Sequence, residues 1–169
     1  MWPLKLRSRE DWVRAGFSFA EPSSLHRGDQ AAIHVRGIVA GDRTYSCFKM
    51  PACYHIETSQ RCIFVTLEGI VTDQDLIEGQ HRMVNEPLFV GSYSRLVDAR
   101  TVTKLLVTAN CVRRVAKEAI AQGVRRVSLV ANTDFVYAMM RMYEGYAFEA
   151  ECFVSRDWDA AAAWLFAQR

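Results

Sequence analysis

Apolar and polar residues alternate along residues 54–166 in a pattern that predicts short strands separated by amphipathic helices. The run at residues 62–68 is apolar on both faces, as a central strand is, and residues 69–71 continue it. Further strand patterns occupy residues 54–57, 95–98, 127–131 and 148–154. The predicted order is strand, strand, helix, strand, helix, strand, helix, strand, helix.

Each predicted helix follows a side chain that can accept hydrogen bonds from free backbone amides. Thr72, with Asp75 three residues on, forms a capping-box pattern. The other predicted caps are Thr108, the segment at residues 132–134, and Asp157. The first helix is expected to end at residues 85–87, before proline, and the second at Gly123.

This order predicts an α/β domain over residues 50–169, with a mixed sheet of four to five strands and about four helices packed on it. Residues 1–49 carry eight Lys or Arg and five Asp or Glu, a net charge of +3, whereas residues 50–169 carry −1. We interpret residues 1–49 as an N-terminal extension, either poorly ordered or a small hairpin with strands at 31–40 and 44–48. One hypothesis is that the functional protein starts at Met50.

Composition narrows the function classes. A formal net charge of only +2 argues against a nucleic-acid binder, which concentrates basic residues on one face. No apolar run reaches the roughly 18 residues that span a bilayer, and Glu10 and Asp11 interrupt any signal peptide. The five cysteines are odd in number and irregularly spaced, which indicates reduced thiols. A cytoplasmic location is therefore expected.

The chain also resembles a known family. The resemblance lies in VTLEGIVTDQDL at residues 65–76, LVDARTVT at 96–103, RDWDA at 156–160, and the segment Met139–Tyr143. These stretches resemble the SpoIIAA-like family of the STAS (sulphate transporter and anti-sigma-factor antagonist) superfamily, and relatives of that family resemble CRAL-TRIO lipid-binding domains. The resemblance covers residues 54–166 and implies a SpoIIAA-like fold and a regulatory or binding role without catalysis.

In phosphorylation-switched STAS proteins, a serine at the start of the second helix accepts a phosphate, in a loop that usually reads Asp-Ser-Ser-Gly. The matching stretch here is residues 106–110, in which only Thr108 has a hydroxyl group. The resemblance therefore implies Thr108 as the phosphoacceptor, although the acid and the glycine of the loop are missing. The alternative is that Thr108 is only a helix cap.

Two groups of residues are candidates for binding a ligand or a partner. Asp98 and Arg100 are expected at the carboxyl end of a central strand, where open α/β sheets bind ligands, although local capping is the alternative. The helix at residues 135–146 is apolar nearly all round and presents Met139, Met140 and Tyr143. It either lines a groove for a small apolar ligand, contacts a protein partner or a second copy of the chain, or simply packs in the core. If it docks a partner, Met140→Asp is expected to weaken association and leave the fold intact.

Motifs of catalysis and cofactor binding are missing from the sequence. It contains no Gly-x-Ser-x-Gly elbow, no Gly-x-Gly-x-x-Gly run and no Walker pattern, so no catalytic residue and no cofactor is predicted. Cys53 and His55 lie two apart, but no second close pair completes a zinc site, and no metal is predicted. Two alternatives stay open: a membrane-surface module that uses an amphipathic helix at residues 2–14, and an enzyme with a convergent site.

Overall fold

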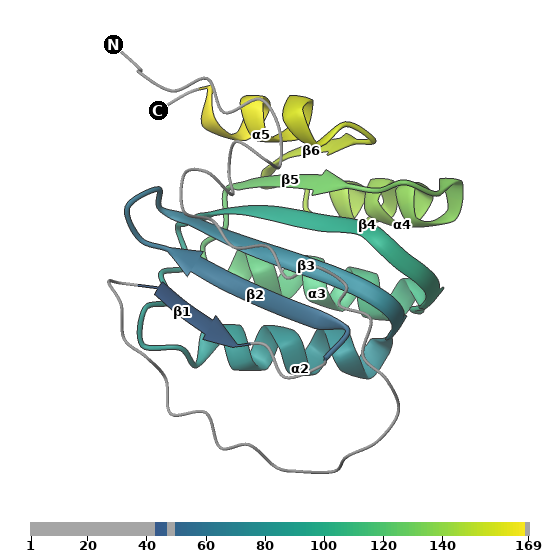
Figure 1. The fold of residues 1–169 in the computed structure, drawn as a ribbon, viewed down its shortest axis with the longest axis horizontal. Coiled ribbons are helices and arrows are strands. Elements are labelled where there is room, and N and C mark those ends of the chain that lie inside the picture. The colour runs from purple at the N-terminus through teal and green to yellow at the C-terminus, as the bar shows by residue number, and fades with distance from the viewer. Residues whose placement is uncertain (1–42, 47–49, 168–169) are drawn as a thin grey trace, which may run out of the picture. The chain divides into compact units, whose positions relative to one another are not determined.

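The computed structural model describes residues 43–46 and 50–167, whose strands form one six-stranded sheet in the order β1-β2-β3-β4-β5-β6. The strands are β1 (Arg43–Ser46), β2 (Ala52–Glu57), β3 (Cys62–Thr72), β4 (Ser94–Leu106), β5 (Arg126–Val130) and β6 (Glu151–Ser155). The helices among these residues are α2 (Asp73–Val84), α3 (Ala109–Ala121), α4 (Asp134–Tyr146) and α5 (Trp158–Phe166). The first two pairings, β1 with β2 and β2 with β3, are antiparallel, and β3 to β6 run parallel (Figure 1).

The predicted fold class is confirmed, because strands β2 to β6 and the four helices follow the predicted order. Strand β1 adds a sixth strand, and it comes from the segment that the sequence assigns to an N-terminal extension. All described residues belong to one unit, Val39–Arg169. The predicted strand at 31–40 and the predicted amphipathic helix at 2–14 lie outside the described residues, so the division at residue 49 stays a prediction.

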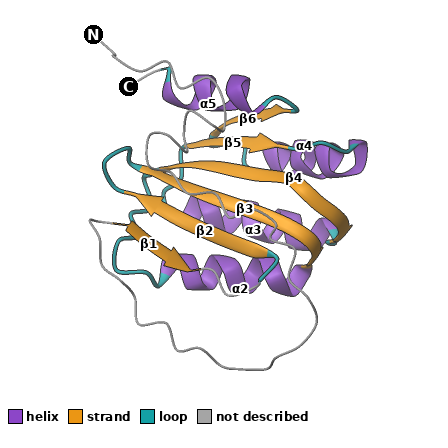
Figure 2. Ribbon diagram, in the orientation of Figure 1, coloured by secondary structure: helices purple, strands orange, loops and turns teal. Residues whose placement is uncertain are grey.

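The order of the strands decides where the helices lie. Each parallel strand is added on the same side of the previous one, so right-handed crossovers place α2, α3 and α4 on one face of the sheet. Helix α5 follows the last strand and packs on β4, β5 and β6 from the other face, where Leu96, Val130 and Trp158 meet. Figure 2 shows α5 beside β6, far from α2.

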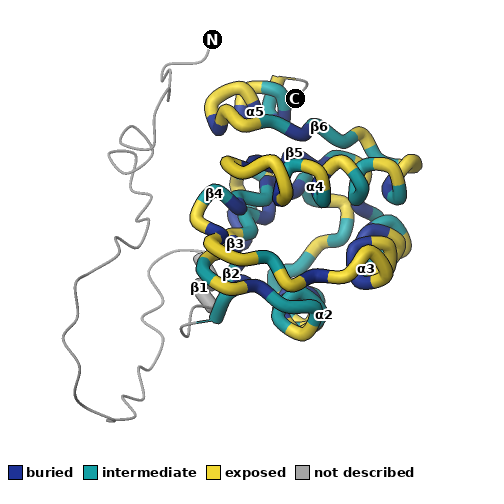
Figure 3. Tube along the Cα trace, turned by 90° about the vertical axis from the view of Figure 1, so that its right-hand side faces the viewer, coloured by how far each residue is buried: buried dark blue, intermediate teal, exposed yellow. Residues whose placement is uncertain are grey.

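Burial follows this layering. The largest apolar cluster lies between the sheet and α2, α3 and α4, and a second cluster lies under α5. Figure 3 shows the buried positions along the strands, with exposed positions on the outer sides of the helices. Burying apolar surface contributes about 25 cal/mol per Å² to stability, so both clusters stabilise the fold.

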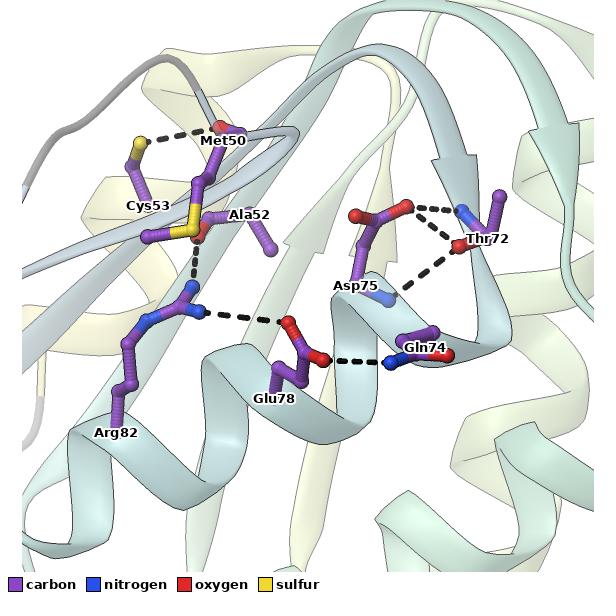
Figure 4. Close-up of polar contacts among 8 residues, drawn as sticks. All are labelled: Met50, Ala52, Cys53, Thr72, Gln74, Asp75, Glu78 and Arg82. Carbon is purple, nitrogen blue, oxygen red and sulfur yellow. Dashed lines mark hydrogen bonds and ion pairs between the residues drawn. The ribbon is translucent and has the colours of Figure 1, made fainter.

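The helix caps are those that the sequence predicts. Thr72 and Asp75 form the capping box of α2: the Thr72 backbone amide donates to the Asp75 carboxylate at 2.8 Å, and the Asp75 amide donates to the Thr72 hydroxyl at 3.4 Å (Figure 4). The other caps are Thr108, Thr133 and Asp157. Helix α2 is also tied to β2, since Arg82 donates to the carbonyl oxygen of Ala52 at 3.2 Å (Figure 4).

Strand β4 is much longer than the predicted strand at residues 95–98. It pairs with β3 as far as Leu106, whereas its pairing with β5 ends at Asp98 opposite Val130. Beyond that point one edge of β4 has no neighbouring strand among the described residues, and polar side chains such as Thr103 and Lys104 are exposed there. This outer part therefore lacks the apolar pattern by which a strand is recognised in a sequence.

No helix among the described residues has the length and apolarity to cross a membrane.

Candidate functional site

A cavity of about 140 Å³ lies between the sheet and helices α2, α3 and α4. Most of the side chains around it are apolar, and the lining residues include Val97, Ala99, Leu129, Met139, Met140 and Tyr143. Helix α2 contributes Leu76, Gln80 and Met83, together with Gly79, which brings no side chain to the wall. An apolar cavity of about 150 Å³ engineered into another protein stays dry and binds benzene, so this one has room for a molecule of that size.

The three candidates on helix α4 all face this cavity. Met140 is only 6% exposed, and Met139 and Tyr143 are partly covered and pack on the same apolar cluster. The helix therefore turns its methionine-rich side toward the sheet of its own domain. A role of these residues in contacts with a partner protein or a second copy stays a prediction.

Arg95 also lines the cavity, and the sequence analysis did not single it out. Strand alternation points Arg95, Val97 and Ala99 to the face that α2, α3 and α4 cover. The guanidinium Nη2 donates to Oε1 of Gln122, at the end of α3, at 2.8 Å. One feature of the sequence could have pointed to Arg95: it lies two and four residues before Val97 and Ala99, so a strand places it on the same face as these apolar residues. Lys and Arg are seldom buried without a partner, so an arginine at such a position is unusual.

Burial shifts the pKa values of two groups at this end of the cavity. It lowers the pKa of the Arg95 guanidinium below its ordinary value, which still leaves the group charged at neutral pH. Burial raises the pKa of Tyr143 to about 12, although the nearby charge of Arg95 acts in the opposite direction. At neutral pH, Tyr143 is therefore a neutral phenol and Arg95 a cation.

Asp98 and Arg100 lie on the opposite face of the sheet, under α5. The Arg100 Nε and Nη2 atoms donate to the two carboxylate oxygens of Asp98 at 2.9 and 2.8 Å, and its guanidinium lies 4.9 Å from the ring centre of Trp158. The hydrogen bonds that Arg100 donates to Asp98 raise the pKa of Arg100. The expected position at the carboxyl end of β4 is wrong, because β4 continues to Leu106, although Asp98 is level with the last residue of β5. A binding role for this pair stays a prediction.

Thr108 joins the starts of two helices. Its backbone amide and its hydroxyl donate to the two carboxylate oxygens of Asp73, in the first turn of α2, at 2.7 and 2.8 Å. The same hydroxyl accepts from the backbone amide of Cys111 at 3.2 Å, so Thr108 caps α3 as predicted. Burial alone would raise the pKa of Asp73, but the hydrogen bonds from Thr108 outweigh it and lower that pKa.

A phosphate on Thr108 would remove the hydroxyl proton that Asp73 accepts and would place about two negative charges beside that carboxylate. The contact between the starts of α2 and α3 would then become repulsive. That Thr108 accepts a phosphate stays a prediction; if it does, we expect the phosphate to weaken the contact between α2 and α3.

We expect Thr108→Val to lower the free energy of unfolding by about 1–2 kcal/mol at pH 7, because it removes the cap and the bond to Asp73. Because the pKa of Asp73 is lowered, its contribution to stability is present above the ordinary aspartate pKa of 3.8 and is lost as the pH falls below that value. The difference between variant and wild type in urea denaturation should therefore shrink in acid. Thr103→Val, at an exposed position of β4, is the control, and an equal loss in both variants would contradict the role of the cap.

Cys111 and Cys152 do not have the properties of catalytic thiols. Burial raises the pKa of both Cys111 and Cys152 to about 11, whereas reactive cysteines have lowered values. Nor do any three His, Cys, Asp or Glu side chains of the described residues gather as a metal ion would require. Cys47, which the sequence analysis counted among the thiols, lies outside these residues.

No family model and no curated protein sequence matches the chain. Among solved structures, it is similar to an uncharacterised protein of the DUF3478 family from Shewanella loihica PV-4, which is described as having a SpoIIAA-like fold. The match covers 76% of this chain and 99% of that protein, at 16% sequence identity and a TM-score of 0.48. The likeness concerns the fold alone. The description of the Shewanella loihica protein names the same fold, SpoIIAA-like, that the sequence resemblance implied.

Proposed function

We propose that this chain is a non-enzymatic, STAS-like binding module whose cavity takes up a small apolar molecule. The cavity of about 140 Å³ between the sheet and helices α2, α3 and α4 is the observation that carries this proposal. Close packing normally leaves few voids larger than a water molecule in a protein core. A cavity lined mostly by apolar side chains, with a few polar groups at its wall, is the usual form of a small-molecule site.

The chemistry of the cavity wall supports binding rather than catalysis. The polar side chains that line it include Gln80, Arg95 and Tyr143, and no His, Asp or Glu occurs among its described lining residues. Tyr143 has a raised pKa, which is the wrong direction for a general base at neutral pH. The wall can therefore orient a molecule, but it offers no pair of nucleophile and base.

The cavity also touches the segment on which a regulatory role would act. Val107 and Val112 line it, and they lie on either side of the Thr108 cap along the chain. A molecule in the cavity would add contacts to the start of α3 and would stabilise the folded state by RT ln(1 + [L]/Kd). Occupancy of the cavity would in this way favour the contact between Thr108 and Asp73.

Two six-carbon probes, 1-hexanol and hexanoate, test this function by calorimetric titration and by the shift in Tm of the full chain. We expect at least one probe to bind wild type and raise its Tm, and Ala99→Leu to bind neither, because the larger side chain fills part of the cavity. Ala163→Leu, at an exposed position of α5, is the matched control and should bind like wild type. The proposed function is rejected if wild type binds neither probe, or if Ala99→Leu binds as tightly as wild type.

A further inference from the structure

Arg95 is a buried cation whose hydrogen bonds are incomplete. Arg95 is only 5% exposed, yet it lines the cavity, and within the described part of the chain its side chain has one hydrogen bond, to Gln122. The guanidinium Nε atom has no hydrogen-bond partner among the described residues. Phe89 lies 6.0 Å from the guanidinium carbon, which adds an aromatic face but no acceptor in the plane of the group.

No negative charge in the described part of the chain balances Arg95. The cavity wall there contains no Asp or Glu, and the side-chain oxygen that Arg95 binds belongs to a neutral amide. Tyr143 does not supply the charge either, because burial raises the pKa of its phenol to about 12. A buried charge is costly unless it is paired and hydrogen-bonded, so this site is electrostatically incomplete without an anion.

We propose that the molecule in the cavity is a small carboxylic acid, whose carboxylate binds Arg95 and whose apolar body lies among Val97, Leu129 and Met139. This inference rests on the proposed function, since it names the chemical class of the ligand of the same cavity. The planar guanidinium matches a carboxylate through two parallel N–H bonds. The volume of about 140 Å³ sets the size of the body at about six carbon atoms.

The test asks whether a negative charge on the ligand strengthens binding. Hexanoate, which is ionised at pH 7, is therefore compared with the uncharged 1-hexanol in calorimetric titrations of the full chain at that pH. We expect wild type to bind hexanoate about tenfold or more tightly than 1-hexanol, as charge-assisted hydrogen bonds require. Arg95→Met should lose this preference and still bind 1-hexanol, because an apolar side chain in place of a buried charge usually preserves the fold. Arg113→Met removes the same charge from an exposed position of α3 and should keep the preference.

The remaining outcomes separate this inference from the proposed function. If wild type binds 1-hexanol as tightly as hexanoate, or if Arg95→Met keeps the preference, the ligand class is wrong while the apolar cavity remains. If wild type binds neither probe, the proposed function fails, and this inference fails with it. The comparison of the two probes on wild type needs no variant. Arg95→Lys is a second variant, which keeps the charge but loses the planar guanidinium, so hexanoate should bind it several-fold more weakly than wild type.

Discussion

Met140→Asp is expected to lower the free energy of unfolding by about 4 kcal/mol or more. The side chain of Met140 is 6% exposed and belongs to the apolar cluster between the sheet and helices α2, α3 and α4. The substitution removes apolar contacts worth about 2–5 kcal/mol and places a carboxylate within an apolar cluster. This result replaces the expectation that Met140→Asp weakens association and leaves the fold intact, because Met140 faces the interior of its own domain.

Urea denaturation followed by circular dichroism at pH 7 measures this loss. Ala138→Asp is the matched control, since Ala138 lies on the same helix two residues away and is exposed. It should cost less than about 1 kcal/mol, the difference in helix propensity between alanine and aspartate. A Met140→Asp variant as stable as Ala138→Asp would show that α4 does not pack on the sheet as described.

The second large effect is expected at Gly91, in the turn before β4. A Cβ atom added there would lie 1.7 Å from the carbonyl oxygen of Gln122 and 2.9 Å from its carbonyl carbon. These are backbone atoms at the end of α3, so no side chain can rotate away to relieve the clash. We expect Gly91→Ala to lower the free energy of unfolding by about 3 kcal/mol, as overpacked sites do at the upper end of their range.

Gly145→Ala provides the control for Gly91→Ala. An added Cβ at Gly145, in the last turns of α4, meets no atom within 4 Å, and alanine favours the helix by up to about 1 kcal/mol. Its expected effect therefore has the opposite sign. Because Gln122 also binds Arg95, Gly91→Ala should in addition weaken hexanoate binding, if it still folds. Equal stabilities for the two variants would contradict the close approach at Gly91.

The local signals in the sequence were sufficient for the helices. Thr72, Thr108 and Asp157 each cap the helix that follows, as predicted, because a cap depends on side-chain oxygens within three residues of the amides they bind. The end of α3 at Gly123 was predictable for the same reason: its φ of 95° is the left-handed geometry that glycine adopts easily.

Signals that depend on distant neighbours were not sufficient. The outer half of β4 was missed because its polar residues extend past β5, where β3 is its one partner strand among the residues that the structure describes. Because the predicted strand was too short, Asp98 and Arg100 were expected at its end. In the structure they lie within β4 and bind each other under α5. Composition near each residue carries no information about how far its neighbouring strand continues.

The sequence by itself determined the order of strands and helices, their caps, and the apolar character of α4, because these follow from periodicity and from contacts within a few residues. Only the tertiary structure decided which side of each element faces the interior and what lies there. It brings Met139 and Tyr143 of α4 to one cavity with Arg95 of β4, and it leaves that arginine without an acid among the described residues. The position of a charged side chain at the wall of an apolar cavity depends on packing across the whole sheet, so it cannot be predicted from neighbouring residues in the sequence.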